Sequence, residues 1–200
     1  SGDRLDLAQL LGDAGDCNAA QLLFVSRDVR LFAGGPVPRR EDVWWHAWPV
    51  AYADAVERAV ARPGAAGREL VYAIMREESS FRPTVLSPAG AYGLMQIMPA
   101  TGERLARDTG RRSFTADDLL VPEINVELGA HYLGQLSERF PDRLSAAIAS
   151  YNAGPGAVSE WIARAPTAPD DEWVEAIPYD ETRRYVKRVL RSLHAYRVLY

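Results

Sequence analysis

The chain has 200 residues, of which 48% are hydrophobic and 25% are charged, and its formal net charge is −4. This balance is typical of a folded globular domain and argues against disorder. The net negative charge offers no overall positive field, so we expect no nucleic acid partner. The single cysteine, Cys17, excludes an intrachain disulfide and a cysteine-rich metal site.

No run of about 18 apolar residues is present, so no segment is expected to span a membrane. The first four residues, SGDR, lack the basic and then apolar layout of a secretion signal. If the protein is exported, we therefore expect this chain to be a processed form.

Apolar residues at three- and four-residue steps predict helices through most of the chain. The first are expected at 5–11 and about 19–33, followed by a connector at 34–49 that contains Trp44, Trp45 and Trp48. We interpret these tryptophans as packing residues, with a sugar-binding platform as the alternative. The later helices are predicted at 52–61, 68–81, 99–108, 122–139, 142–150, 154–163 and 181–199, with Pro or Gly near most boundaries.

No stretch sustains the alternation of a half-buried strand, so the fold class is predicted to be mainly α. The expected organisation is a compact domain over 51–200. It is preceded at 1–50 by a helical segment and linker, which is interpreted as the end of a larger helical region.

A carboxylate lies in the apolar stripe of the predicted helix 68–81. At 100° per residue, Glu78 falls about 40° from Ile74. Such a position desolvates the carboxyl group, raises its pKa and suits a general acid. On the wheel alone, however, a surface pair at a frayed helix end is the favoured interpretation, and Glu77 and Glu78 are not distinguished.

Three further segments combine turn formers with polar side chains. In Ser87–Pro99 (SPAGAYGLMQIMP), Gly90 and Gly93 allow a tight turn, and Gln96 is an amide among apolar neighbours that should be hydrogen-bonded. Ser150–Gly156 (SYNAGPG) links two predicted helices. In Ile177–Val186 (IPYDETRRYV), Asp180 is predicted to cap the last helix and Glu181 to lie in its first turn, ahead of an inward stripe formed by Tyr185, Val189, Leu193, Tyr196 and Tyr200.

Four motifs stand in the order found in a known family. They are Glu78-Ser79-x-Phe81, Ser87-x-x-Gly90-Ala91-x-Gly93-Leu94-Met95-Gln96 with Pro99-Ala100-Thr101, Tyr151-Asn152-Ala153-Gly154, and Ile177-Pro178-x-x-Glu181-Thr182-x-x-Tyr185-Val186. Over about residues 50–200 the chain resembles the soluble lytic transglycosylases. The resemblance implies a goose-lysozyme-like catalytic domain at 51–200 and an exported enzyme of the periplasm or cell envelope.

The resemblance assigns the catalytic role to Glu78, because the family's catalytic Glu directly precedes a Ser, and it leaves Glu77 on the helix surface. Glu181 is expected to be a supporting acid in the groove floor. The substrate-binding residues that it implies are Ser79, Ser87, Met95, Gln96, Tyr151, Asn152, Glu181 and Tyr185.

The family mechanism implies that one carboxyl group cleaves the β-1,4 bond between N-acetylmuramic acid (MurNAc) and N-acetylglucosamine (GlcNAc). Glu78 would protonate the bridging oxygen, the substrate's own acetamido group would stabilise the sugar cation, and the C6 hydroxyl would close a 1,6-anhydro ring. Peptidoglycan strands are then the partner, no cofactor is required, and a monomer is expected.

Two other functions stay open from the sequence. A hydrolase on the same fold would use water and leave a reducing end, and an inactive module would only bind glycan. A metal enzyme is disfavoured, because His46, His131 and His194 are scattered without a metal-binding spacing.

Overall fold

The protein is represented by a computed structural model that describes residues 2–25, 32 and 41–200. These residues form helices and loops, with two isolated β-bridges that join Tyr92 to Leu86 and to Ile97. The helices are α1 (Gly2–Asp13), α2 (Cys17–Val25), α3 (Glu41–Ala47), α4 (Ala53–Val60), α5 (Arg68–Ser79), α6 (Pro99–Asp108), the 3-10 helix η2 (Ala116–Leu120), α7 (Pro122–Arg139), α8 (Leu144–Ala153), α9 (Pro155–Arg164), α10 (Asp170–Glu175) and α11 (Asp180–Leu199).

The predicted helices at 99–108 and 122–139 are confirmed at both ends by α6 and α7. Each begins with a proline, whose fixed φ and missing N–H suit the first turn of a helix. The short helices η2 and α10 were not predicted, because five or six residues are too few to display a helical period.

The predicted connector at 34–49 is partly wrong, since α3 makes 41–47 helical, while 34–40 lies outside the described residues. The helix expected at 19–33 is described as α2 up to Val25, and 26–31 also lies outside. The prediction that Asp180 caps α11 is wrong as well: Tyr179 occupies the cap, and Asp180 is the first helical residue, paired with Arg183.

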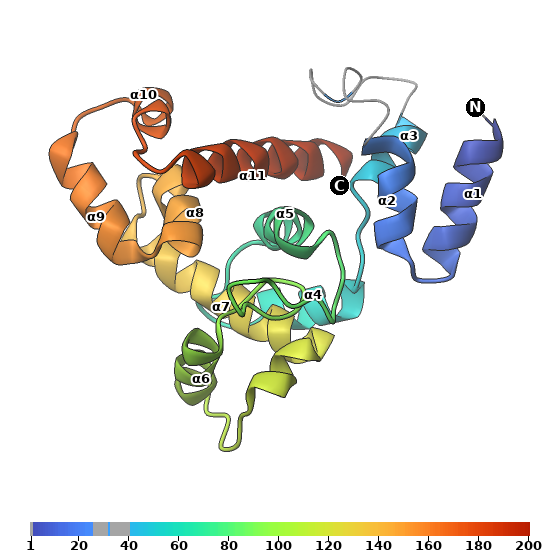
Figure 1. Cartoon of the computed structure of the whole chain (residues 1–200), viewed down its shortest axis with the longest axis horizontal. Coiled ribbons are helices and arrows are strands. Elements are labelled where there is room, and N and C mark those ends of the chain that lie inside the picture. The colour runs from blue at the N-terminus through green and yellow to red at the C-terminus, as the bar shows by residue number, and fades with distance from the viewer. Residues whose placement is uncertain (1, 26–31, 33–40) are drawn as a thin grey trace.

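Helix α5 lies at the centre of the molecule, and every residue from Leu70 to Arg76 is buried. It packs mainly against α11, which crosses above it from the α8–α10 group to the α1–α3 group (Figure 1). Helices α4, α7 and α8 complete the surroundings, with α4 packed on α7 and α8 packed on α7, α9 and α11. Helix α5 is therefore enclosed mainly by α11, α4 and α7.

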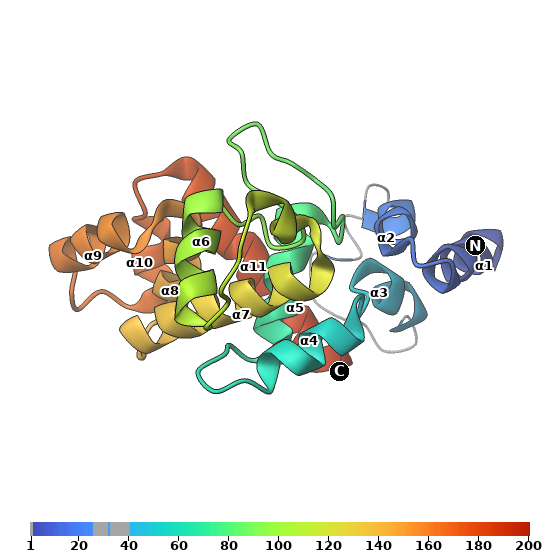
Figure 2. The same cartoon turned by 90° about the horizontal axis from the view of Figure 1, so that it is seen from below.

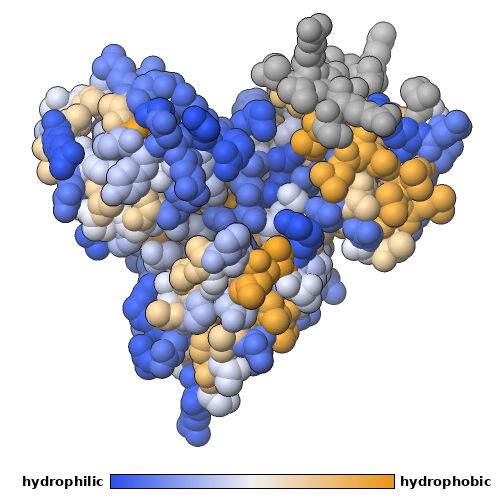
Figure 3. Space-filling view, in the orientation of Figure 1, coloured by the Kyte–Doolittle hydropathy of each residue, from blue (hydrophilic) through white to orange (hydrophobic). Residues whose placement is uncertain are grey.

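Helices α1–α3 lie at one end of the molecule and α9–α10 at the other (Figure 2). The packing interpretation of the tryptophans holds for Trp44 and Trp48, which are stacked on each other, contact Phe32 and are almost fully buried. Trp45 differs, since it is 49% exposed. Apolar side chains gather on the surface of this end (Figure 3), where Leu7, Leu10 and Leu22 are also exposed.

Within the described ranges, no helix is both long enough and apolar enough to cross a membrane.

Candidate active site

Glu78 lies in the last turn of α5, which ends two residues earlier than predicted. Ser80 (φ 50°) and Phe81 (φ 63°) both adopt the left-handed region, which stops the helix. Two consecutive non-glycine residues in this region store strain, and such strain concentrates at functional sites. The turn at Ser80 and Phe81 therefore ends α5 at Ser79, directly after Glu78.

The carboxyl group of Glu78 is largely buried and accepts a 2.6 Å hydrogen bond at Oε1 from Tyr185 Oη. Burial raises the pKa of Glu78 from 4.5 to about 7, although the Tyr185 hydrogen bond and the charge of Arg188 both lower it. The nearby charges of Glu77 and Glu181 raise it further. Glu78 is thus poised to hold and release a proton near neutral pH, as acid/base catalysis requires.

A cleft of about 300 Å³ opens between α6, α7 and the end of α8. Its walls are Gln96, Ile97, Met98, Thr101, Tyr132, Tyr151, Asn152, Ala153 and Gly154. The structure therefore brings together three of the predicted site residues, Gln96, Tyr151 and Asn152. Glu78 is not among the residues that line the cleft, but it lies close enough to Tyr151 for its charge to help raise the pKa of that phenol, after the larger effect of burial.

Tyr151 and Asn152 come from the last turn of α8. The Tyr151 hydroxyl donates a 2.8 Å hydrogen bond to the carbonyl of Met95, which ties the end of α8 to the loop 85–97. Asn152 Oδ1 accepts a 2.6 Å hydrogen bond from Thr182 on α11. In this arrangement the Asn152 oxygen is occupied, and its nitrogen makes no hydrogen bond to any described residue.

Gln96 stands in the loop 85–97, in a left-handed conformation with φ 49°. Its Nε2 donates to the carbonyls of Gly93 (2.8 Å) and Val85 (3.2 Å), so the predicted hydrogen bonding of this amide is confirmed. Both side-chain N–H groups of Gln96 bind within the loop, and its side-chain oxygen Oε1 accepts no hydrogen bond from any described residue. This oxygen remains available to a sugar hydroxyl or amide.

The loop is shaped by an amide that the sequence analysis missed, Asn125 on α7. Asn125 Oδ1 accepts from the Met95 amide at 2.7 Å, and its Nδ2 donates to the carbonyls of Tyr92 (2.9 Å) and Leu119 (2.8 Å). The sequence signal that could have identified Asn125 was an amide within the apolar pattern of 122–139. In the structure this side chain is fully buried. At Gly93 (φ 75°), an added Cβ would lie 2.2 Å from the Leu119 carbonyl oxygen, so only glycine allows this approach.

The other predicted binding residues are not among those that line the cleft, and they make different contacts. The Ser87 hydroxyl accepts a hydrogen bond from the Ala91 amide and shapes the loop. Ser79 is buried, and its hydroxyl donates a hydrogen bond to the Met75 carbonyl. Met95 has no exposed surface, and Tyr185 is buried against Glu78. Glu181 is exposed, close enough for its charge to act on Glu78.

Met98 was missed by the sequence analysis, which selected Met95 instead. The Met98 residue is 44% exposed and lines the cleft, whereas Met95 packs inward against Gly129 on α7. The two methionines are three residues apart in a loop, where no helical or strand period indicates which one faces outward.

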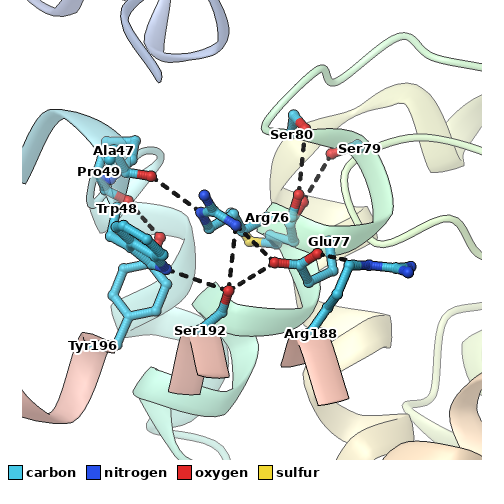
Figure 4. A network of polar contacts seen from close by, with 11 residues as sticks. Ala47, Trp48, Pro49, Arg76, Glu77, Ser79, Ser80, Arg188, Ser192 and Tyr196 are labelled. Carbon is cyan, nitrogen blue, oxygen red and sulfur yellow. Dashed lines mark hydrogen bonds and ion pairs between the residues drawn. The ribbon is translucent and has the colours of Figure 1, made fainter. Parts of the chain in front are cut away.

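The expectation that Glu77 lies on the helix surface is wrong. Its side chain is only 7% exposed and pairs with Arg76 Nη1 (2.7 Å) and Arg188 Nε (3.2 Å), as Figure 4 shows. Ser192 on α11 donates to the same carboxylate at 2.7 Å. The helical wheel considers α5 alone, so it did not reveal that α11 presents the Arg188 guanidinium and the Ser192 hydroxyl to Glu77.

The chain was compared with known proteins. A family model described as the transglycosylase SLT domain matches residues 57–174. The soluble lytic murein transglycosylase of Escherichia coli (strain K12) is 38% identical over 157 residues, which cover 74% of this chain and 24% of that protein. The membrane-bound lytic murein transglycosylase C of Salmonella arizonae is 31% identical over 163 residues, which cover 70% of this chain and 45% of that protein.

Solved structures similar to this chain are also lytic transglycosylases. The 70 kDa soluble lytic transglycosylase SLT70 from Escherichia coli matches with a TM-score of 0.83 and 31% identity, over 96% of this chain and 29% of that one. An inactive glutamate-to-glutamine mutant of Slt from Pseudomonas aeruginosa matches with a TM-score of 0.81 and 32% identity, over 94% and 29%. The chain thus spans about a quarter of the length of the soluble relatives.

These similarities confirm the predicted mainly α, lysozyme-like fold. The family match covers more than half of the chain, including the Glu78, Gln96 and Tyr151 motifs. The chain belongs to the SLT transglycosylase family.

Proposed function

We propose that this chain is the catalytic domain of a peptidoglycan lytic transglycosylase in which Glu78 is the single acid/base. The observation that carries the proposal is the Glu78 carboxyl group itself, with its pKa raised to about 7 beside a cleft that is lined by Gln96 and Tyr151. A protonated carboxylic acid near neutral pH is the group needed to cleave a glycosidic bond. The names of the relatives point to murein as the substrate class.

In the proposed reaction, Glu78 donates its proton to the oxygen that bridges C1 of MurNAc and the following GlcNAc. The C1–O bond breaks, and the muramic acetamido oxygen stabilises the positive charge at C1. The Glu78 carboxylate then removes the proton from the C6 hydroxyl of the same sugar, whose oxygen bonds to C1. The product ends in 1,6-anhydro-MurNAc, Glu78 is protonated again, and no water is consumed.

The state of the neighbouring carboxylate Glu77 supports a single-acid mechanism. Most glycosidases use two carboxyl groups, and a retaining pair lies about 5 Å apart. Glu77, next in the chain, is occupied by Arg76, Arg188 and Ser192, so it is not free to attack a sugar. Tyr185 and Tyr151 both have pKa values raised well above 10, first by burial, so these phenols stay protonated as hydrogen-bond donors.

The cleft suggests how the glycan is held. The free carbonyl oxygen of Gln96 and the amide nitrogen of Asn152 offer one acceptor and one donor for sugar N-acetyl or hydroxyl groups. The exposed Met98 offers an apolar contact for a ring face. We propose that Ser79, Ser87, Met95, Tyr185 and Glu181 act around these contacts, Glu181 as a supporting acid. A monomer in the cell envelope, facing the periplasm, fits this substrate.

Glu78→Gln tests the assignment, because it removes the transferable proton and preserves the shape of the side chain. We expect loss of activity on purified cell walls, of at least roughly 100-fold, since general acid catalysis contributes that much or more. Near-normal turnover of the folded variant would contradict the role of Glu78.

A hydrolase on the same fold is the second candidate. Mass spectrometry of the released muropeptides separates the two, because an anhydro end is lighter than a reducing end by one water, about 18 Da. Clearance of cell-wall suspensions by the native chain separates both enzymes from a module that only binds glycan.

A further inference from the structure

We propose that Glu77 is a positioning residue for the reaction: its buried carboxylate locks the last turn of α5 onto α11 and thereby holds the Glu78 carboxyl against Tyr185. The proposal rests on the proposed role of Glu78 as the acid/base. We name the side chains involved, Arg76, Glu77, Arg188, Ser192 and Trp48, the Glu77 cluster (Figure 4).

The hydrogen bonds of the cluster converge on one hydroxyl. Ser192 Oγ donates to Glu77 Oε1 (2.7 Å) and accepts from Arg76 Nη1 (3.3 Å) and Trp48 Nε1 (3.2 Å). One donor and two acceptor positions are the full capacity of a serine hydroxyl. A buried polar group with every position filled fixes its neighbours strongly, because each alternative arrangement leaves a group unpaired.

Arg76 extends the cluster to the segment that precedes the catalytic region. Its Nε donates to the Ala47 carbonyl at 3.0 Å, and its guanidinium lies 4.2 Å from the centre of the Trp48 ring. The Arg76 residue is 5% exposed, so these contacts are shielded from solvent. The cation that neutralises Glu77 is therefore held in place from outside α5 and α11.

One face of α11 contacts the last turn of α5, which carries Glu77 and Glu78. Tyr185, Arg188 and Ser192 follow one another at three- and four-residue steps, which places them in a row on the helix surface. Tyr185 bonds Glu78, whereas Arg188 and Ser192 bond Glu77. Because adjacent helical residues differ by 100° in direction, fixing Glu77 to α11 also fixes the direction in which Glu78 leaves α5.

The cluster also places charge near the acid. Arg188, held by Glu77, lowers the pKa of Glu78, and Glu77 raises it, while burial remains the largest influence. The other groups that face Glu78 are Tyr185 and Glu181 on α11 and Tyr151 on α8. Removing either member of the Glu77–Arg188 pair should therefore shift the pH dependence of activity, in opposite directions.

The test is the pH profile of kcat/KM on purified glycan strands for Glu77→Gln and Arg188→Gln. For Glu77→Gln we expect kcat to fall by on the order of 10- to 100-fold with little change in KM. The alkaline limb, which reports the acid, should move to lower pH in Glu77→Gln and to higher pH in Arg188→Gln. Glu160→Gln is the charge-matched control, since the Glu160 side chain is 73% exposed and its ion pair among the described residues is with Arg164.

A merely structural role would lower activity without moving the limb. Native kcat with unmoved limbs, or limbs that move in the same direction, would overturn the proposal. If Glu77→Gln fails to fold, Arg188→Gln and Ser192→Ala test the proposal instead. The Arg188 side chain is 45% exposed, and the alkaline limb of Arg188→Gln must move to higher pH. Ser192→Ala must lower kcat. Glu78→Gln separates the two proposals. An active Glu78→Gln variant would contradict the proposed function. An inactive Glu78→Gln variant, together with a Glu77→Gln variant whose kcat and pH profile match the native protein, would contradict only the positioning role.

Discussion

Tyr185 and Glu78 lie 107 residues apart in the sequence, yet the Tyr185 hydroxyl donates a 2.6 Å hydrogen bond to the Glu78 carboxyl group. The phenol stabilises the ionised form of a carboxyl group whose burial favours the neutral form. These opposing effects leave the pKa of Glu78 at about 7, where the group can both donate and accept a proton.

Tyr185→Phe should therefore raise the pKa of Glu78, because it removes an interaction that lowers this pKa. We expect the alkaline limb of kcat/KM to move to higher pH, and a stability loss of about 1 kcal/mol from the lost hydrogen bond. Tyr196→Phe is the control, since its hydroxyl is also buried in α11 but bonds the Pro49 carbonyl. It should lose similar stability and leave the limb in place; a limb that stays in place in Tyr185→Phe as well would contradict the electrostatic role of the phenol.

Glu78→Gln should stabilise the fold at alkaline pH. The folded pKa of Glu78 is raised from 4.5 to about 7, so the stability that this group contributes is complete below pH 4.5 and is lost as the pH rises through 7. At about 1.36 kcal/mol per pKa unit, the loss is of the order of 3 kcal/mol. Thermal unfolding at pH 4 and pH 8 should show a higher Tm for Glu78→Gln at pH 8 only, and no such pH-dependent gain for Glu160→Gln.

Gly93→Ala should destabilise the loop 85–97 strongly, because the new methyl group would lie 2.2 Å from the Leu119 carbonyl oxygen in a left-handed backbone. We expect a loss of at least about 3 kcal/mol in urea unfolding, together with reduced activity. Gly110→Ala is the matched control: its φ of 78° is similar, but no atom lies within 4 Å of the added carbon. It should cost only the backbone strain, about 1 kcal/mol, and equal losses would show that the contact with Leu119 is unimportant.

Trp45 within α3 and Trp48 directly after it should differ sharply in their contribution to stability. Trp48→Ala removes a ring that is 1% exposed and stacks against Trp44 and Arg76, so we expect a loss of about 3–5 kcal/mol. Trp45→Ala removes a ring that is 49% exposed, with an expected change within about 0.5 kcal/mol. Denaturant titration of both variants measures the difference. Similar values would indicate that the segment before residue 51 contributes little to the catalytic region.

Much of this architecture could be predicted because helices are encoded locally. The three- and four-residue spacing of apolar side chains indicated α6 and α7 to the residue. For α5 the helical wheel alone favoured a surface pair of glutamates, and it was the family motif Glu78-Ser79 that singled out Glu78. The site residues Gln96, Tyr151 and Asn152 were predicted from their motifs, and they meet at one cleft.

The errors share one physical origin. Glu77 was assigned to the surface because a helical wheel shows one helix and not the neighbour that supplies Arg188 and Ser192. Asn125 was overlooked because its three partners come from the loop 85–97 and from η2. Met98, which lines the cleft, was not singled out because an irregular loop has no period that indicates which side chains face outward.

The sequence by itself determined the class of fold, most of the helices and the residue proposed as the acid, since periodicity and motif order are properties of neighbouring residues. Only the tertiary structure decided how that acid is tuned. Tyr185, Arg188 and Ser192 reach the end of α5 from a helix more than 100 residues away, and burial between these helices supplies the low-polarity surroundings. Solvation and charge depend on which groups meet in space, and that information appears only when the chain has folded.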